Sequence, residues 1–192
     1  RAAVLGDTVY VAGGTTGADL ETAQRNFWSL DLSERNGDDQ LRWQQLPAWP
    51  GPERGFAIAV AQHNGTHECV YVISGPRNSE NADGSDPNAP GAVEFLTDVY
   101  EFNPTRFRAE AYDRTSDAYQ DPISPWRQRA DVPRCVMAGT AIAVGQSHVM
   151  VLGGADGSLF HRGDELRDDH PGFPKSALSY HTITDTWVEA GA

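Results

Sequence analysis

The sequence predicts an all-β fold, because one plan of four short strands occurs three times within the 192 residues. In each occurrence a small apolar strand is followed by a second strand that ends at a glycine pair or its equivalent. An aromatic strand and a lone Trp then complete the unit. Short apolar runs separated by tight glycine-containing turns are typical of antiparallel strands, and the polar loops inserted between them account for the length of each unit.

The third unit shows the plan most completely. Its second strand ends at Gly153 and Gly154, and its fourth strand carries Trp187. The four strands are predicted at residues 138–144, 148–152, 177–182 and 185–188. The first unit fills the same positions with residues 1–5, 9–14, 27–32 and 43, and the second with residues 56–60, 70–75, 99–103 and 126. In the second unit Ser74 replaces the first glycine of the pair.

This plan is that of a Kelch-type β-propeller, in which each unit forms one four-stranded blade. The expected blades cover approximately residues 1–47, 54–132 and 134–192, and together they make one partial propeller. Three blades cannot close a ring, since propellers typically have about four to eight blades. We therefore expect half of a six-bladed propeller, completed by missing sequence, by another chain or by a second copy of this chain.

The composition narrows the classes of partner. A net charge of -12 and an isoelectric point near 4.7 argue against a general nucleic-acid binder. No apolar run approaches the roughly 20 residues that span a membrane, so no membrane partner is expected. The compartment stays open, because the chain starts inside its first predicted strand and a signal peptide could have preceded it. Cys69 and Cys135 are too few for a disulfide scaffold or a zinc site, and we expect two buried free thiols.

Strand alternation predicts which loops share a face. Successive strands of a blade run in opposite directions, so the loops that follow the three glycine pairs emerge at one end of the array. The proline-rich links that carry Arg54 and Arg134 emerge at the same end. The insertion over residues 105–125 is placed at the opposite end. Its aromatic and alanine residues could support a short helix or an added hairpin, and irregular structure is expected. Loops that converge on one end of a rigid scaffold commonly form binding sites.

Two groups of residues on this face are candidates for binding. Arg54 and Arg134 precede first strands, and guanidinium groups recognise carboxylates through paired hydrogen bonds; the alternative is that such arginines tie adjacent blades together. The run Arg77-Asn78-Ser79-Glu80 offers a cation, an amide, a hydroxyl and a carboxylate, against the alternative of a solvated loop. In the third unit, carboxylates and a histidine within residues 163–170 suit either a hard cation or a solvated loop, and the solvated loop is expected.

Five stretches in order resemble the cyclically permuted mutarotases, a family that includes the N-acetylneuraminate epimerases. The stretches are Gly51–Ala57, Asn78–Glu80, Phe95–Pro104, Met137–Gly139 and Tyr180–Trp187. The family consists of six-bladed Kelch propellers, and the resemblance implies a sialic acid mutarotase, an isomerase that interconverts α and β anomers by acid and base catalysis. It implies no cofactor and no metal, a sialic acid or related sugar as the ligand, and a periplasmic or secreted location.

The same resemblance implies roles for residues of this chain. The expected sugar-binding residues are Arg54, Arg77, Asn78, Arg134 and Met137. The family's acid/base Glu belongs to a Gly-Glu-x-x-Pro-Gly-x-Arg-Thr stretch, which this sequence does not contain, so the main catalytic Glu is expected outside this chain. Glu80 is the in-chain candidate for proton transfer.

Two other functions remain open from the sequence. A non-catalytic Kelch module that binds a glycan or a protein on its loop face has the same strand plan. A copper radical oxidase of the Kelch class is disfavoured, because the chain offers no convincing constellation of Tyr and His with a thiol-linked Cys.

Overall fold

Three antiparallel sheets of four strands make up the computed structural model, which describes residues 1–17, 20–33, 41–80, 91–110 and 124–191. The first sheet contains β1 (Ala2–Leu5), β2 (Thr8–Gly14), β3 (Gln24–Asp31) and β4 (Gln44–Leu46). The second contains β5 (Ile58–His63), β6 (Glu68–Asn78), β7 (Val93–Phe102) and β8 (Trp126–Arg129). The third contains β9 (Thr140–Val144), β10 (His148–Leu152), β11 (Ala177–His181) and β12 (Thr186–Ala190). Within each sheet the strands follow chain order, which confirms the prediction of three four-stranded blades.

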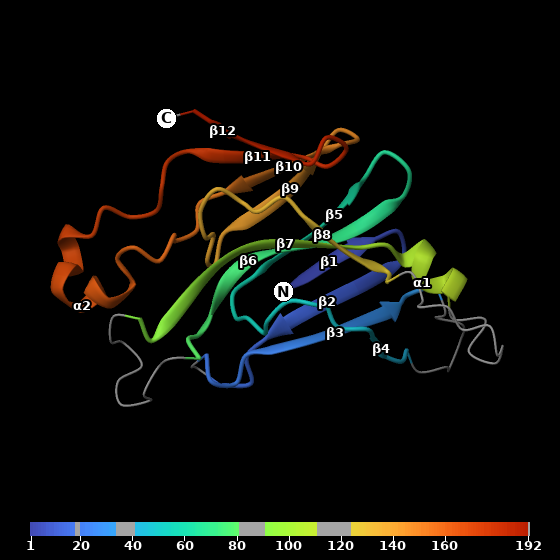
Figure 1. The fold of residues 1–192 in the computed structure, drawn as a ribbon, viewed down its shortest axis with the longest axis horizontal. Coiled ribbons are helices and arrows are strands. Elements are labelled where there is room, and N and C mark those ends of the chain that lie inside the picture. Colours follow the sequence, from blue (N-terminus) through green and yellow to red (C-terminus); the bar gives the residue numbers. More distant parts are fainter. Residues whose placement is uncertain (18–19, 34–40, 81–90, 111–123, 192) are drawn as a thin grey trace.

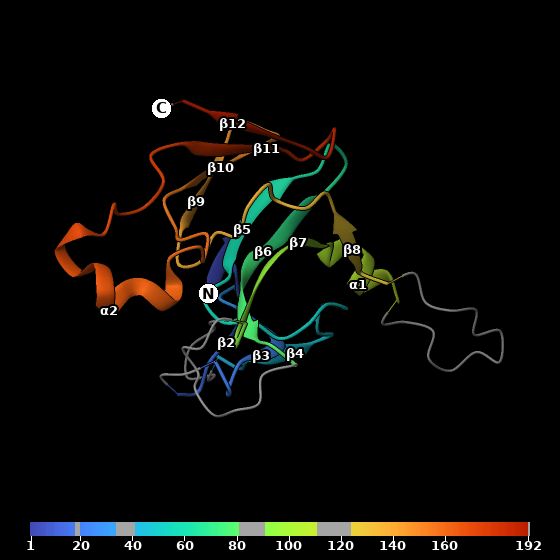
Figure 2. The ribbon, with the colours of Figure 1, turned by 60° about the vertical axis from the view of Figure 1, so that its left-hand side comes forward.

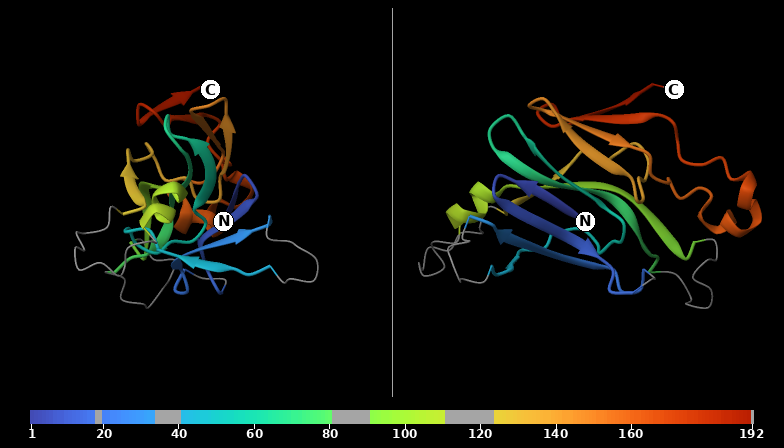
Figure 3. Two further views of the ribbon diagram at one scale, coloured as in Figure 1. Left: turned by 90° about the vertical axis from the view of Figure 1, so that its right-hand side faces the viewer. Right: turned by 180° about the vertical axis from the view of Figure 1, so that it is seen from behind.

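The second blade lies between the other two (Figures 2 and 3). Its first strand, β5, contacts the first strands of both neighbours, β1 and β9. In a propeller the first strand of each blade is the innermost one, so these three strands line the side that faces the propeller axis. The order of the blades in space is therefore their order in the chain.

Two hydrophobic clusters hold the three blades together. The first lies between blades 1 and 2 and includes Phe27, Phe102 and Trp126, whose rings meet edge-on or tilted at centroid distances of 4.9 to 5.0 Å. The second lies between blades 2 and 3 and includes Tyr180, which stacks on Trp187 at 4.7 Å. Strand β6 is buried from Cys69 to Pro76 because it has a blade against each of its faces. Both cysteines are buried free thiols, as the sequence predicted.

Blades 1 and 3 each turn one sheet face away from blade 2, and these outer faces remain apolar. On blade 3, Val149 and Val151 point into the interface and are buried, whereas Ile142 and Val188 on the other side of the sheet are 50% and 62% exposed. On blade 1, Val4 is 61% exposed for the same reason. Alternation along each strand thus gives every blade two apolar faces, as a blade with a neighbour on both sides requires.

The described parts of the loops that follow the glycine pairs gather at one end of the array, as predicted, and the tight hairpin turns at the other (Figure 1). The left-handed backbone of Gly13 and Gly153, with φ of 51° and 64°, starts two of these loops. Ser74 occupies the same position in blade 2 and keeps a φ of 57° despite its side chain. Its hydroxyl donates to the Leu96 carbonyl at 2.8 Å and accepts from the Val136 amide at 2.8 Å, which compensates for the backbone conformation.

Helices occur only in the insertions of the described chain. Helix α1 (Pro104–Glu110) follows β7 at the end opposite the glycine-pair loops, and the Asn103 side chain caps it by accepting from the Thr105 and Arg106 amides. The prediction of irregular structure was wrong for this part of the insertion, because Asn103 and Pro104 supply a helix start; residues 111–123 lie outside the described chain. The third blade carries a short run of helical turns, η1 (Phe160–Arg162), α2 (Gly163–Leu166) and η2 (Arg167–Asp169). None of the described helices is long and apolar enough to span a membrane.

Candidate functional site

The end of the array that carries the glycine-pair loops is called the loop face here. It comprises the described parts of the β2–β3, β6–β7 and β10–β11 loops and the links that lead into β5 and β9. The link into β5 is fastened to the end of β6, because the Gly55 amide donates to the Pro76 carbonyl at 2.9 Å. Links and loops therefore form one continuous surface.

Arg54 lies beneath this surface with a side chain that is 0% exposed. Its guanidinium binds both carboxylate oxygens of Asp98 on β7, with an Nη2 to Oδ2 distance of 2.7 Å. The guanidinium also lies 5.7 Å from the ring of Trp49 and 5.6 Å from that of Tyr100. Burial, together with the neighbouring Asp98, raises the pKa of Tyr100 to about 12. Arg54 thus has the geometry of a residue that ties the link to the middle blade, and a sugar carboxylate would reach it only if Asp98 moved.

Arg77 lies at the loop face among three carboxylates. Its Nε donates to Glu94 at 2.6 Å, and its Nη1 lies 3.0 Å from Glu80 and 3.8 Å from Glu53. The bond to Glu94 is the main reason that the pKa of Arg77 is raised. Glu80, the in-chain candidate for proton transfer, is 78% exposed and paired with Arg77. The charge of this group is therefore negative overall, although an arginine is at its centre.

Arg134 lines a shallow depression of about 480 Å³ between blades 2 and 3. The other residues that matter there are Val93, Phe95, Asp156, Ser158 and His161. The Arg134 Nη1 makes a long hydrogen bond of 3.5 Å to the Cys135 carbonyl. Across the described residues no carboxylate lies within 4 Å of this guanidinium, in contrast to those of Arg54 and Arg77. Arg134 is therefore better placed than either to receive an anion from solution.

Asp156 gives the depression its carboxylate. Its Oδ1 accepts from the Ser158 hydroxyl at 2.7 Å and the Ser158 amide at 2.9 Å. These two bonds, with a smaller effect from Arg134, lower the pKa of Asp156. The carboxylate consequently stays ionised, and so remains a hydrogen-bond acceptor, at a lower pH than an ordinary aspartate would.

Gly157 lets the loop that carries Asp156 pack directly against Phe95, a residue that lines the depression. It has a φ of 89°, and a side chain there would approach the Phe95 ring to 2.3 Å. Phe95 in turn meets Phe160 edge-on at 5.5 Å. The Phe95 ring therefore forms an aromatic wall of the depression, next to the Arg134 and Asp156 side chains.

Met137 and Asn78 lie at the edges of this surface. Met137 pairs with Ala155 through two backbone hydrogen bonds of 2.8 and 2.9 Å, which fix the link into β9 against the loop that carries Asp156. Asn78 is the last residue of β6 and pairs with Val93, which lines the depression. The structure thus brings Arg134, Met137 and Asn78 to one region and Arg77 with Glu80 to a neighbouring one, while Arg54 is buried below.

Asp156, His161 and Phe95 were not predicted as site residues from the sequence, although a signal existed for the first. Asp156 stands two residues after Gly154, as Arg77 stands two residues after Gly75. Comparison of the three blades position by position therefore selects Asp156 as the equivalent of Arg77. No comparable signal identified His161 or Phe95, because their proximity depends on how the long loop of blade 3 folds over blade 2.

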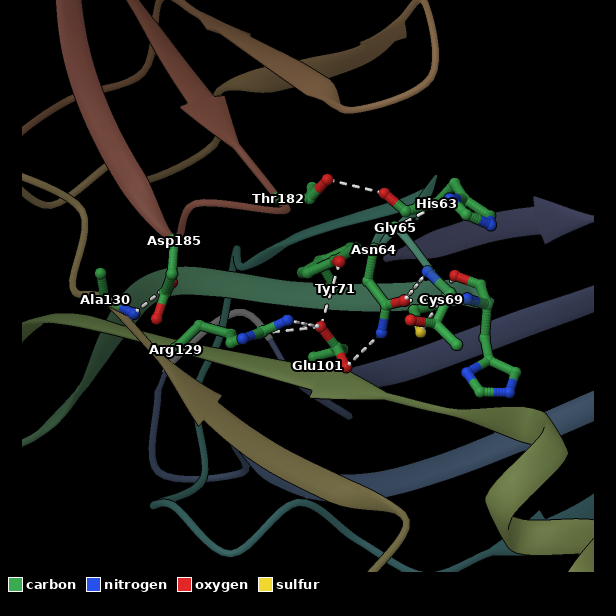
Figure 4. Close-up of polar contacts among 12 residues, drawn as sticks. His63, Asn64, Gly65, Cys69, Tyr71, Glu101, Arg129, Ala130, Thr182 and Asp185 are labelled. Carbon is green, nitrogen blue, oxygen red and sulfur yellow. Dashed lines mark hydrogen bonds and ion pairs between the residues drawn. The ribbon is translucent and has the colours of Figure 1, made fainter.

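A second polar cluster lies at the opposite end, between blades 2 and 3 (Figure 4). Glu101 is 3% exposed and accepts from Arg129 Nε at 2.8 Å, Asn64 at 3.0 Å and the Tyr71 hydroxyl at 3.1 Å. Beside it, Asp185 of blade 3 accepts from the Ala130 amide of blade 2 at 2.8 Å. Burial is the main cause that raises the pKa of Tyr71, and Glu101 adds to it. All these groups are satisfied within the protein, which is typical of a structural network.

Neither end offers a metal centre in the described chain, where no group of three or more His, Cys, Asp or Glu side chains is placed to hold an ion. The described part of residues 163–170 forms α2 and η2 and has its charged side chains largely exposed. The backbone there forms helical turns rather than the expected loop, and the described carboxylates at Glu165, Asp168 and Asp169 are exposed.

The sequence of the chain was compared with those of known proteins, and the similar ones share one name. No family model matches the chain. The N-acetylneuraminate epimerase of Haemophilus influenzae (strain PittEE) is 26% identical over 213 aligned positions, which cover 98% of this chain and 45% of that protein. The chain resembles the N-acetylneuraminate epimerases. Another of them, from Pasteurella multocida (strain Pm70), is 24% identical over 83% of this chain and 31% of its own length.

The epimerase resemblance extends through all three blades, and the chain spans about half the length of the curated relatives it matches. Among solved structures, that of YjhT superposes with a TM-score of 0.63 at 19% identity, covering 99% of this chain and 49% of that one. A chain from a RAG complex with one melted and one unmelted RSS superposes with a TM-score of 0.59 at 13% identity. At these identities the likeness concerns the fold, which is three blades of a Kelch-type β-propeller.

Proposed function

We propose that this chain provides the sugar-binding loop face of a sialic acid mutarotase, supported by its resemblance to proteins named N-acetylneuraminate epimerase. The observation that carries the proposal is the depression lined by Arg134, Asp156 and Phe95 on that face. Sialic acid bears a carboxylate on its anomeric carbon, hydroxyl groups around the ring and an apolar ring face. A guanidinium, a carboxylate and an aromatic wall complement these three features in turn.

The chemistry of the proposed reaction is proton transfer. Anomer exchange removes the proton of the anomeric hydroxyl and protonates the ring oxygen, and the reverse steps on the other face of the opened sugar restore the ring. In this chain Arg134 would hold the carboxylate next to the anomeric carbon, and Asp156 would accept hydrogen bonds from sugar hydroxyls. Glu80 remains the in-chain candidate for proton transfer, and the resemblance assigns the main acid/base Glu to a stretch that this sequence does not contain.

We expect Arg134→Ala to weaken binding of N-acetylneuraminate by about tenfold to a hundredfold, because a charge-assisted hydrogen bond is worth about 1.5–3 kcal/mol. Arg127→Ala is the matched control, since Arg127 is also an arginine but is exposed on β8, away from the depression. Isothermal titration calorimetry measures the affinities, and NMR of the α and β signals measures anomer exchange. Equal affinities of Arg134→Ala and the parent protein would refute the role of the depression.

A non-catalytic glycan-binding module is the second candidate, and the exposure of Glu80 favours it. A side chain that is 78% exposed and paired with Arg77 lacks the enclosed setting in which carboxylates usually transfer protons. Binding of N-acetylneuraminate without accelerated anomer exchange would support this candidate for the chain on its own. Accelerated exchange that Glu80→Gln abolishes would support the mutarotase with Glu80 as its acid/base group.

We further propose that additional blades cover the apolar outer faces of blades 1 and 3, from a longer chain or from a second copy. The exposed Val4, Ile142 and Val188 support this, since large exposed apolar patches on sheet faces favour association. If a second copy closes the ring, light scattering of the 192-residue chain is expected to give about twice 20.9 kDa at all concentrations tested. A monomer that stays soluble at high concentration would contradict coverage by a second copy.

A further inference from the structure

Phe56 combines two features that rarely occur together on a protein surface. Its backbone is left-handed, with a φ of 49°, and the residue is 45% exposed. It lies on the loop face two residues before β5, the inner strand of the middle blade. A bulky residue in this region of backbone space carries a steric cost that glycine avoids.

The surrounding backbone enforces the conformation. The Phe56 carbonyl accepts from the Ala138 amide at 3.1 Å, and the Gly55 amide donates to Pro76 at 2.9 Å. Gly75 packs so closely that a side chain on it would lie 2.5 Å from the Gly55 carbonyl. Backbone contacts therefore fix the chain at Gly55 and at Phe56. They explain the positive φ of Phe56, but they do not explain why this residue is aromatic.

The equivalent residue of blade 3 shows which side chain the backbone contacts alone require. Ala138 stands two residues before β9, as Phe56 stands before β5, and it has a φ of 58°. A methyl group thus suffices at the equivalent position. Residues held in costly backbone conformations cluster at ligand sites, where the conformation presents a side chain. The Phe56 ring, half exposed and carried on a strained backbone, fits that description.

We propose that the Phe56 ring is a stacking platform for the apolar C–H face of a pyranose bound on the loop face. The inference rests on the proposed function for the class of ligand, an N-acylated acidic sugar. The Phe56 carbonyl accepts from the Ala138 amide, and the preceding residue, Met137, pairs with Ala155 beside Asp156. Backbone hydrogen bonds therefore link the platform to the depression that holds Arg134 and Asp156. Aromatic side chains supply much of the contact surface in ligand sites because they bury a large area with few rotatable bonds.

The test compares Phe56→Gly with Ala138→Gly, which makes the same backbone change without removing a ring. Both variants are expected to keep the melting temperature of the parent or to exceed it, because glycine relieves the left-handed strain. Only Phe56→Gly is expected to lose affinity for N-acetylneuraminate, by about tenfold. Phe56→Tyr retains the ring and is expected to bind like the parent. Calorimetry gives the affinities, and nuclear Overhauser effects between Phe ring protons and sugar C–H protons detect the stacking in the parent.

The outcomes separate this inference from the proposed function. If Phe56→Gly binds as tightly as the parent while Arg134→Ala does not, the platform is refuted and the proposed function stands. If Phe56→Gly is clearly less stable than Ala138→Gly, the ring is a packing group and the platform is refuted. If the parent binds no N-acetylneuraminate, the proposed function fails; Phe56-dependent binding of a neutral methyl pyranoside would then still support the platform, and its absence would refute it.

Discussion

Arg54→Ala is expected to lower the free energy of unfolding by about 3–5 kcal/mol, the usual cost of removing one partner of a buried ion pair. The substitution leaves Asp98 without its cation and opens a space between the rings of Trp49 and Tyr100. Arg54→Lys is expected to be intermediate, because an ammonium group cannot bind both carboxylate oxygens in the planar arrangement of a guanidinium. Denaturation by urea, followed by tryptophan fluorescence, measures all three proteins.

Arg162→Ala is the matched control for this prediction. Arg162 also pairs with a carboxylate, that of Glu165, but its side chain is 48% exposed, so its loss is expected to leave the free energy of unfolding nearly unchanged. The contrary outcome is an Arg54→Ala protein as stable as the parent that binds N-acetylneuraminate poorly. That result would mean that Asp98 releases Arg54 to the ligand, as the sequence analysis allowed.

Glu101→Ala is expected to destabilise the protein by about 3 kcal/mol or more, because it leaves the Arg129 guanidinium buried without its carboxylate. Arg129 is 11% exposed, so water cannot fully replace the lost partner. The Tyr71 hydroxyl and the Asn64 amide lose an acceptor at the same time. Chemical denaturation measures the loss of free energy of unfolding. The dependence of that free energy on denaturant concentration, the m-value, is expected to stay the same if the fold is unchanged.

The double variant Glu101→Met with Arg129→Met provides the control. If Glu101 and Arg129 stabilise each other, the double variant is expected to lose less free energy of unfolding than the two single variants lose in sum. Strictly additive single effects would contradict a direct interaction. A Glu101→Ala protein with unchanged stability would show that the Asp185, Ala130 and Trp187 contacts hold blades 2 and 3 together without it.

Repetition is what made the fold predictable from one sequence. Each glycine pair and each Trp marks a fixed position within its blade, so three weak local signals reinforce one another. Ser74 shows the limit of the pattern, because the left-handed turn survives the loss of its glycine only through bonds to Leu96 and Val136 from other parts of the chain. Helix α1 was one of the alternatives that the composition allowed, but irregular structure was preferred, because the helix start depends on the capping contacts of Asn103 and on Pro104.

The candidate site was less predictable, since it depends on contacts between residues far apart in the sequence. Arg54 and Arg134 precede first strands in similar links, yet Arg54 meets Asp98 on β7 and is buried, while Arg134 stays at the surface. No local pattern distinguishes them, because the difference arises from a carboxylate 44 residues away from Arg54. Strand alternation, in contrast, placed the glycine-pair loops on one face correctly, since it follows from the antiparallel order alone.

The positions of the two buried ion pairs bear on where in the array the free energy of unfolding arises. Arg54 is packed into the contact between blades 1 and 2, and Glu101 into the contact between blades 2 and 3. In a linear array each unit interacts only with its nearest neighbours, so the free energy resides in the junctions as much as in the units. Asp98, Glu101 and Arg129 all belong to the middle blade, and Arg54 belongs to the link that leads into it, so each ion pair lies on the middle blade's side of its junction. The middle blade thus has a buried ion pair next to each of its neighbours, and we expect the loss of one pair to weaken the nearer junction more than the other.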